Sequence, residues 1–253
     1  MPLIRAKNLI VDFPIYGTTT NRSIKKKILH AATGGALAKD ASDHVVVRAL
    51  DKLNFEFHDG DRVGLIGHNG SGKSTLLRVL AGIYEPIAGE ITVQGRVTSM
   101  LSITLGMDME ATGLENAFMR GYVMGVSTKK MAAAIEDIDE FSGLGEFLHL
   151  PIRTYSSGMT MRLAFAISTC FDSDIILMDE WLSVGDSEFA AKAKTRLDRM
   201  LNNAQIVVIA SHNHSMVQDQ CNKIIQLEHG KIVSIESKTQ AKTIGTDTTG
   251  NIV

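Results

Sequence analysis

A glycine-rich segment at residues 67–75 constrains the fold of this chain more than any other feature. It reads GHNGSGKST, which matches the phosphate-binding pattern G-x-x-x-x-G-K-[ST] at every fixed position. The apolar run 62–66 before it is typical of a buried parallel strand, and the segment 76–82 after it has helical spacing and ends on a glycine. Strand, loop and helix are the context that the pattern requires. The sequence therefore predicts a site for a nucleoside triphosphate.

Each residue type in this segment has a physical reason to be there. Glycines let successive backbone N–H groups approach one anion, and the positive end of the following helix faces it. Lys73 adds a positive charge, and the hydroxyl of Ser74 can bind Mg²⁺. We expect the nucleotide to contact the whole segment, which consists of Gly67, His68, Asn69, Gly70, Ser71, Gly72, Lys73, Ser74 and Thr75.

A pair of acidic residues follows the apolar run 175–178. Because ligands bind at the carboxyl ends of strands in open α/β sheets, Asp179 and Glu180 are expected near the phosphates. Asp179 is placed to hold Mg²⁺ together with Ser74. Glu180 can orient or deprotonate a water that attacks the γ-phosphate. An apolar run that ends in Asp-Glu is weak evidence alone, but its position after the phosphate loop strengthens this interpretation.

Two more segments add to the pattern. Tyr155–Met159 opens a helix expected over 160–171, and its Ser-Gly start can bind an anion, although alone it is more typical of an ordinary N-cap. The strand expected at 206–210 ends in Ser211-His212. His212 would then lie on the same sheet edge as Asp179 and Glu180.

Length and charge set further limits. A chain of 253 residues can bury one large core, or a core and a smaller lobe. A net charge of −2 provides no overall electrostatic attraction to nucleic acid, so no nucleic-acid partner is expected. Neither a signal peptide nor a membrane span is expected. Cys170 and Cys221 lack metal-ligand spacing and are expected to be reduced.

The chain divides into four expected regions. Residues 98–150 read as mostly helical, with helices at 115–124 and 129–141, the second capped by Ser127 or Thr128. The apolar side chains of this block are expected to lie mostly in its core: Phe118, Tyr122, Ile135 and Phe141. The first region, 1–97, is the first part of the core and includes an edge strand at 1–17 and a basic insertion at 18–44. It is followed by a helical subdomain (98–154), a second part of the core (155–235) and a polar tail (236–253).

Taken in this order, the segments resemble the ATP-binding subunits of ABC transporters. The resemblance extends to a hairpin around residues 229–230 and includes the family's D-loop at 183–186 and its switch histidine, His212. It implies an α/β fold of the P-loop NTPase class and ABC ATPase type. Such a fold has a mixed sheet core, an N-terminal antiparallel β portion and a helical subdomain. It also implies ATP and Mg²⁺ as ligands, with Lys73, Glu180 and His212 as catalytic residues.

In that family, two subunits pack head to tail around ATP. The resemblance implies that Ser156, Ser157, Gly158 and Asp186 contact nucleotide across the dimer. The family's signature segment falls at residues 155–159, and it departs from the usual one because Ser157 replaces a glycine. The glutamine that usually follows the strand after the phosphate loop is absent, and no residue in 102–104 is assigned its role. Tyr16 is the candidate for stacking on adenine.

Several segments resemble one branch of the family, the ATPases of bacterial polysaccharide export. They are 13–17, 105–108, 111–116, 155–159 and 179–186. This branch exports O-antigen, capsule or teichoic-acid polymers on lipid carriers. The resemblance implies a homodimer, two copies of a transmembrane permease, and a peripheral position on the cytoplasmic face of the bacterial inner membrane.

Some alternatives stay open. The insertion at 18–44 can lie near anionic lipid, where each cation contributes on the order of 1 kcal/mol, or it can be a solvated surface helix. The chain can also serve a different ABC transporter, a non-transport ABC-type ATPase, or an ATP clamp without turnover. The sequence identifies neither the polymer nor the permease.

Overall fold

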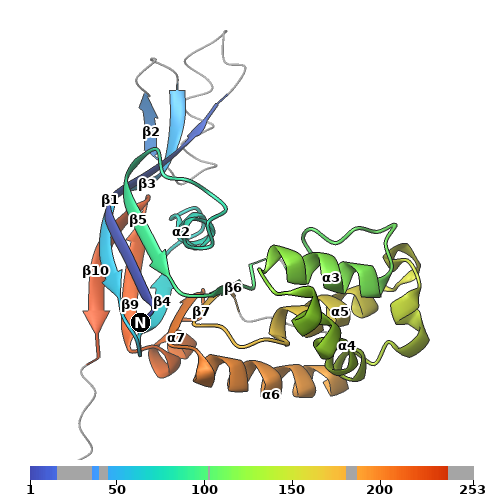
Figure 1. Cartoon of the computed structure of the whole chain (residues 1–253). Helices are drawn as coiled ribbons and strands as arrows, with labels where there is room; N and C mark the ends of the chain where they lie inside the picture. The colour runs from blue at the N-terminus through green and yellow to red at the C-terminus, as the bar shows by residue number, and fades with distance from the viewer. Residues whose placement is uncertain (16–35, 40–44, 102, 181–186, 239–253) are drawn as a thin grey trace, which may run out of the picture.

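The computed structural model describes residues 1–15, 36–39, 45–101, 103–180 and 187–238 (Figure 1). Tyr16, Asp186, most of the basic insertion and most of the polar tail lie outside these residues. The described chain forms two β-sheets with helices between and below them, and a helical lobe to one side (Figure 1). The α/β class expected from the sequence is confirmed.

The first sheet is antiparallel and has the strand order β2-β3-β1-β5. Its strands are β1 (Leu3–Pro14), β2 (Ala36–Lys39), β3 (Val45–Phe57) and β5 (Ala88–Gln94). The sequence expectation of an edge strand at 1–17 is wrong, because β1 pairs with β3 on one side and with β5 on the other. Pairing on both sides depends on residues about 30 to 90 positions away, which the local pattern does not reveal.

The second sheet has the order β10-β9-β4-β8-β7-β6. The pairs β4–β8, β4–β9, β7–β8 and β6–β7 are parallel, while β9 and β10 form the expected antiparallel hairpin around residues 229–230. Parallel strands place their carboxyl ends on one edge, and this edge carries the phosphate loop. The strands are β4 (Arg62–Ile66), β6 (Val97–Ser99), β7 (Ile175–Asp179), β8 (Ile206–Ala210), β9 (Lys223–Glu228) and β10 (Lys231–Ser237).

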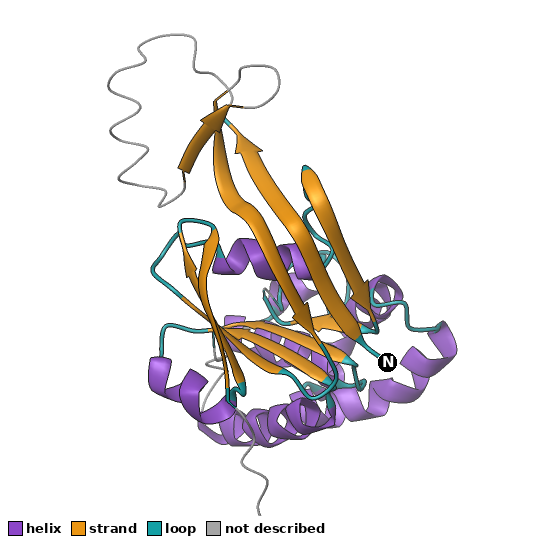
Figure 2. Ribbon diagram, turned by 90° about the vertical axis from the view of Figure 1, so that its left-hand side faces the viewer, coloured by secondary structure: helices purple, strands orange, loops and turns teal. Residues whose placement is uncertain are grey.

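The helix α2 (Lys73–Leu80) packs between the two sheets. Its buried residues Leu76 and Leu77 join one hydrophobic cluster with Leu50 of β3 and Val208 of β8. Figure 2 shows the antiparallel sheet standing across the mixed sheet, with helices on the far side of the latter. Fully burying a leucine stabilises the fold by about 1.5–3 kcal/mol, so this shared cluster fixes the helix, and with it the phosphate loop, against both sheets.

The helical lobe contains three α-helices and two short 3₁₀ segments. Ser127 caps α4, as the sequence predicts, and Thr112 caps α3 in a capping box with Glu115. The elements are α3 (Gly113–Val123), α4 (Thr128–Ser142), η1 (Gly145–His149), η2 (Ile152–Thr154) and α5 (Ser157–Thr169). Two further helices, α6 (Ser187–Asn203) and α7 (His214–Gln220), lie below the mixed sheet (Figure 1).

The placement of Tyr122 differs from the sequence expectation. Phe118, Ile135 and Phe141 pack against the core of the lobe, but Tyr122 is 82% exposed. The buried residues of α3 are Gly113, Asn116, Ala117 and Gly121, and none of them is a large apolar residue, so hydrophobicity does not mark this face. A Cβ atom on Gly121 would lie 2.1 Å from the terminal methyl group of Met131, so the Met131 side chain of α4 packs directly on the backbone of α3 there.

No helix among the described residues combines the length and the apolar character of a membrane span.

Candidate nucleotide site

The phosphate loop connects β4 to α2. Gly67, Gly70 and Gly72 have positive φ angles of 148°, 79° and 110°, which L side chains rarely adopt. A Cβ atom on Gly67 would lie 2.2 Å from the carbonyl oxygen of Leu227, which no small shift relieves. The loop therefore needs glycine for both its conformation and its close contact with β9.

Lys73 is the first residue of α2 and is only 6% exposed. Its Nζ atom donates hydrogen bonds to the carbonyl oxygens of Gly67 at 2.7 Å and His68 at 3.1 Å. Burial lowers the pKa of Lys73, while the charges of Asp179 and Glu180 act in the opposite direction. The amine is thus held over the loop, in the electric field of both acidic residues.

A cavity of about 490 Å³ opens above the loop. It unites residues from both sheets and from the loop, which lie far apart in the sequence. Its lining residues are Phe13, Val47, Ala49, Asn69, Gly70, Gly72, Lys73, Ser74, Thr75, Leu101, Asp179, Glu180 and His212. Gly67, His68 and Ser71 belong to the loop but do not line the cavity.

Glu180 and His212 face each other across the ends of β7 and β8. The Nε2 atom of His212 lies 3.4 Å from Oε1 of Glu180. Glu180 has a φ of +67°, and its backbone N–H donates to the carbonyl oxygen of Ala210 at 2.8 Å. A left-handed conformation in a residue other than glycine costs on the order of 1–3 kcal/mol and is concentrated at functional sites. The side chains of Glu180 and His212 are 63% and 49% exposed, so substrate and water can reach both.

Ser74 and Asp179 line the same cavity and supply a hydroxyl and a carboxylate. Oxygen donors suit Mg²⁺, which usually takes one or two protein ligands and completes its shell with phosphates and water. The donor set therefore fits the metal. Among the described residues, no group of three or more His, Cys, Asp or Glu side chains forms a metal-binding cluster.

Ser156, Ser157 and Gly158 lie at the start of α5, in the helical lobe. Ser156 is the N-cap of α5, and its Oγ accepts a hydrogen bond from the N–H of Met159 at 3.2 Å. Both serines are exposed, and none of the three residues lines the cavity above the phosphate loop. The structure therefore does not bring this segment together with Lys73 within one chain.

Sequence reasoning missed the aromatic residue that lines the cavity. Phe13 of β1 lies at the cavity wall beside Val47, its partner in the β1–β3 register. Its ring packs edge to face with Tyr84, with centroids 5.2 Å apart. The alternation of apolar residues along β1 is the signal that could have indicated Phe13. Leu101 also lines the cavity. It precedes residues 102–104, where the sequence offers no substitute for the family's usual glutamine, and Ile103 in that region is buried.

Comparison with known proteins decides the family. Residues 50–183, more than half of the chain, match the family described as ABC transporter. The chain belongs to the ABC transporter family. Over 226 residues it is 44% identical to the O-antigen export system ATP-binding protein RfbE of Yersinia enterocolitica, with 89% of this chain and 94% of that protein covered.

Other relatives of this ABC cassette also come from polymer export systems. It is 35% identical to the O-antigen export system ATP-binding protein RfbB of Klebsiella pneumoniae, with 93% of this chain and 94% of that protein covered. It is 39% identical to the teichoic acids export ATP-binding protein TagH of Listeria monocytogenes over 73% of this chain. It spans 55% of the length of TagH.

Solved structures agree on the fold. A dimeric, post-hydrolysis ATP-binding cassette bound to ADP and Pi superposes with a TM-score of 0.65 at 19% identity, covering 93% of this chain and 99% of the other. The ATP-binding subunit of an ABC transporter superposes with a TM-score of 0.66 at 17% identity, covering 93% and 90%. The ABC ATPase fold expected from the sequence is confirmed.

Proposed function

We propose that this protein is the ATP-hydrolysing subunit of an ABC transporter that exports a lipid-linked polysaccharide across the cytoplasmic membrane. The observation that carries the ATPase activity is the single cavity that joins Lys73 and Ser74 to Asp179, Glu180 and His212. The observation that carries the cargo class is the similarity to O-antigen and teichoic-acid export proteins over most of the chain.

Each lining residue has a role in this proposal. The loop N–H groups, the α2 dipole and Lys73 bind the phosphates and offset their charge. Ser74 and Asp179 hold Mg²⁺, which when bound neutralises charge on the phosphate oxygens. Glu180 orients or deprotonates the attacking water, and His212, 3.4 Å away, fixes the Glu180 carboxylate and donates toward the γ-phosphate.

The complete site consists of two chains. Ser156, Ser157 and Gly158 lie apart from the cavity of their own chain, and their exposure leaves them free to meet nucleotide held by a second copy. The exposed hydroxyl of Ser156 and the N-terminal end of α5 are suited to the γ-phosphate. Asp186 is assigned to the same dimer interface, and Tyr16 to the adenine, both from the sequence alone.

The helical lobe is the surface proposed for the permease. Met119, Tyr122 and Val123 of α3 are 40%, 82% and 86% exposed, which is unusual for large apolar side chains grouped on one short helix. Two chains and two copies of the permease form the transporter. The ATPase then lies on the cytoplasmic face of the inner membrane, held there by the permease.

The division of the chain into a core (1–97 and 155–235), a helical subdomain (98–154) and a polar tail (236–253) belongs to the same proposal. One hydrophobic cluster joins both sheets with α2, as expected of a separate core. A second cluster contains side chains of α3, α4 and α5, so α5 (Ser157–Thr169), which this division assigns to the core, packs in part with the helical subdomain.

The Glu180→Gln variant tests the proposed activity. The amide cannot deprotonate water, so we expect the ATPase rate at saturating ATP to fall by about 100-fold or more, while ATP affinity stays close to that of wild type. The measurement is phosphate release under steady-state conditions, with equilibrium ATP binding as the control. Equal rates for both proteins would remove Glu180 as the base. A wild type that binds ATP without turnover would identify an ATP clamp.

The cargo class needs a separate test. The purified protein is reconstituted with a candidate transmembrane permease, in vesicles that contain a lipid-linked polysaccharide. We expect ATP-dependent movement of the polymer that Glu180→Gln abolishes. Transport of an unrelated solute, without movement of the polymer, would assign the chain to a different ABC transporter.

A further inference from the structure

The helix α6 links the helical lobe to the rest of the fold. Figure 1 shows α6 running below the mixed sheet and reaching the lobe beside α4 and α5. It begins at Ser187, shortly after Glu180 in the chain. A helix in this position can carry a displacement of the lobe to its own N-terminal end, which is close to Glu180 in the chain, provided that it is fixed to the lobe.

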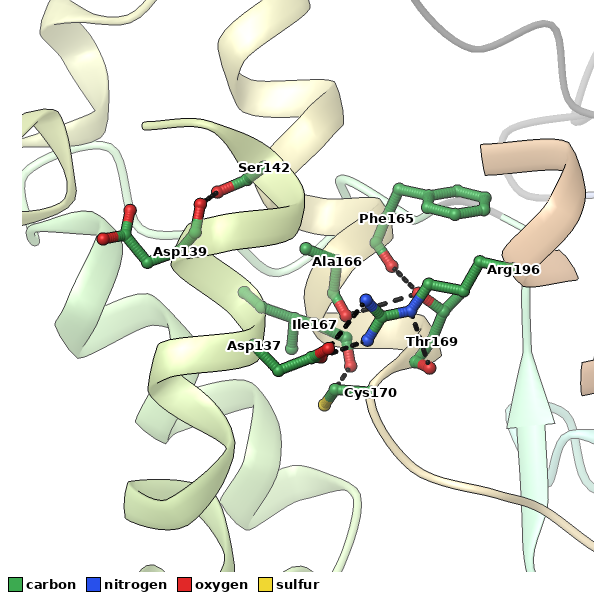
Figure 3. Close-up of polar contacts among 9 residues, drawn as sticks. All are labelled: Asp137, Asp139, Ser142, Phe165, Ala166, Ile167, Thr169, Cys170 and Arg196. Atoms are coloured by element: carbon green, nitrogen blue, oxygen red, sulfur yellow. Dashed lines mark hydrogen bonds and ion pairs between the residues drawn. The ribbon is translucent and has the colours of Figure 1, made fainter. Parts of the chain in front are cut away.

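A buried arginine makes this connection. Arg196 of α6 is 8% exposed, and its guanidinium faces the carboxylate of Asp137 on α4 with both terminal nitrogens (Figure 3). Its Nε atom donates to the carbonyl oxygen of Thr169, the last residue of α5, at 3.3 Å. One side chain of α6 therefore binds two other helices at once.

The guanidinium of Arg196 also packs on an aromatic ring. The Cζ atom of Arg196 lies 4.3 Å from the ring centroid of Phe141 on α4. Phe141 packs against Phe165 of α5 and Phe189 of α6, with centroids 5.9 Å and 5.4 Å apart. Arg162 of α5, close to the signature residues, lies 5.3 Å from the ring of Phe189. The signature helix and the start of α6 thus share one packed cluster.

We propose that Arg196 is a positioning residue for ATP hydrolysis, which fixes α6 to α5 so that Ser156, the N-cap of α5, and the start of α6 keep one relative orientation. The inference rests on the proposed ATPase function. Within the part of the chain that the structure describes, Asp137, Thr169 and Phe141, the partners of Arg196, do not line the nucleotide cavity, so Arg196 acts through α5 and α6. ATP binding by the single chain depends on the loop around Lys73 and should not depend on Arg196.

The geometry of guanidinium explains why arginine occupies this position. Its fixed fork binds a carboxylate with two nitrogens and leaves Nε for a third acceptor, while its plane stacks on an aromatic ring. A lysine ammonium offers one charge centre and cannot satisfy Asp137 and Thr169 in the same way. Because Asp137 is itself 55% exposed, water can solvate its carboxylate when the arginine is removed.

The experiment compares Arg196→Met, Arg196→Lys and Asp137→Asn in the full-length protein. Arg199→Met is the matched control, because Arg199 is an exposed arginine on the same helix. For each protein we measure kcat per nucleotide-binding site, the equilibrium Kd for ATP and the melting temperature. Wild type and Glu180→Gln are assayed in parallel, so that a failure of the proposed ATPase function is recognised separately.

We expect Arg196→Met to lower kcat by about tenfold while the Kd for ATP stays within about twofold, because a small misplacement of catalytic groups is costly and the phosphate loop is untouched. Arg196→Lys and Asp137→Asn should give smaller losses, and Arg199→Met none. In the Arg196→Met background, Asp137→Asn should have no further effect on kcat, since both act through one pair.

A lower melting temperature with unchanged kcat per binding site would overturn the proposal, because the contact would then serve stability alone. Equal changes in kcat and in ATP affinity would also overturn it. If Arg196→Met does not fold, Arg196→Lys and Asp137→Asn carry the same test. An inactive wild type would refute the ATPase function, whereas an active wild type with an equally active Arg196→Met protein refutes only this inference.

Discussion

Two helix N-termini carry residues that we propose to bind phosphate, and they are built differently. At the start of α2, Lys73 is buried and its ammonium is bound by two loop carbonyls, above which lies a cavity that also contains Asp179 and Glu180. At the start of α5, Ser156 is exposed and its Oγ serves only as the N-cap within the described chain. One end is enclosed by its own chain, and the other is open.

The difference indicates how the binding energy is divided. The start of α2 combines a helix dipole, glycine N–H groups and a lysine, so it can hold a nucleotide in a single chain. The start of α5 offers a dipole and a hydroxyl, which give a weak site unless a phosphate is delivered to it. We infer that affinity resides in the first site and that the second adds to hydrolysis only in the dimer.

Among the substitutions that test this comparison, replacing Lys73 should have the largest effect, and the quantity affected is the affinity for ATP. Lys73→Ala removes charge-assisted hydrogen bonds to phosphate, worth about 3 kcal/mol, so ATP affinity should fall roughly 100-fold. Equilibrium binding of ATP to the purified protein measures it, with Lys129→Ala on the exposed surface of α4 as the control. Unchanged affinity in Lys73→Ala would refute the role of the phosphate loop.

Replacing Ser156 should have a smaller effect, and on a different quantity. Ser156→Ala removes one hydrogen bond to the γ-phosphate of the partner's nucleotide, so kcat should fall about tenfold while single-chain ATP affinity is unchanged. The loss of the N-cap also costs about 1 kcal/mol of stability. Steady-state ATPase assays and thermal melts measure the two effects.

Ser127→Ala is the matched control for Ser156→Ala. Ser127 caps α4 with the same type of hydrogen bond, from Lys130 N–H to Oγ, but takes no part in the proposed site. It should lose similar stability with normal kcat. If both variants lost activity equally, Ser156 would be a cap and nothing more, and the comparison of the two helix ends would fail.

The smallest effect is expected at Tyr122. Because its side chain is already 82% exposed, Tyr122→Ala should change the free energy of unfolding by less than about 0.5 kcal/mol and leave basal kcat unaltered. Ile138→Ala, at a fully buried position in the same lobe, should cost about 2–5 kcal/mol. Chemical denaturation measures both. A large loss in Tyr122→Ala would show that α3 packs in another orientation in solution.

The sequence indicated the buried strands well because their patterns are local. The runs 62–66 and 206–210 coincide with β4 and β8, since strands covered on both faces are apolar throughout. The helices shifted by a few residues, with α3 at Gly113–Val123 instead of 115–124 and α5 at Ser157–Thr169 instead of 160–171. Cap residues set these ends, and a serine or threonine can also occur inside a helix.

Other features escaped prediction because they depend on distant partners. Phe13 lines the cavity only because β1 pairs with β3 in the register that places Phe13 beside Val47. The interior position of β1 in its sheet has the same origin. Arg196 reads in the sequence as one more charge on an amphipathic helix, and its partner Asp137 lies 59 positions away.

By itself, the sequence pointed to the candidate nucleotide site, because the glycine loop with Lys73 and the acidic pair at the end of β7 are short contiguous motifs whose residue types suit phosphate and metal binding. The tertiary structure alone decided which side chains complete the cavity, which face of α3 is exposed, and how Arg196 joins three helices. The physical reason is the separation along the chain between the residues that interact. Backbone conformation and charge act on near neighbours in the chain, whereas packing selects its partners only after the chain has folded.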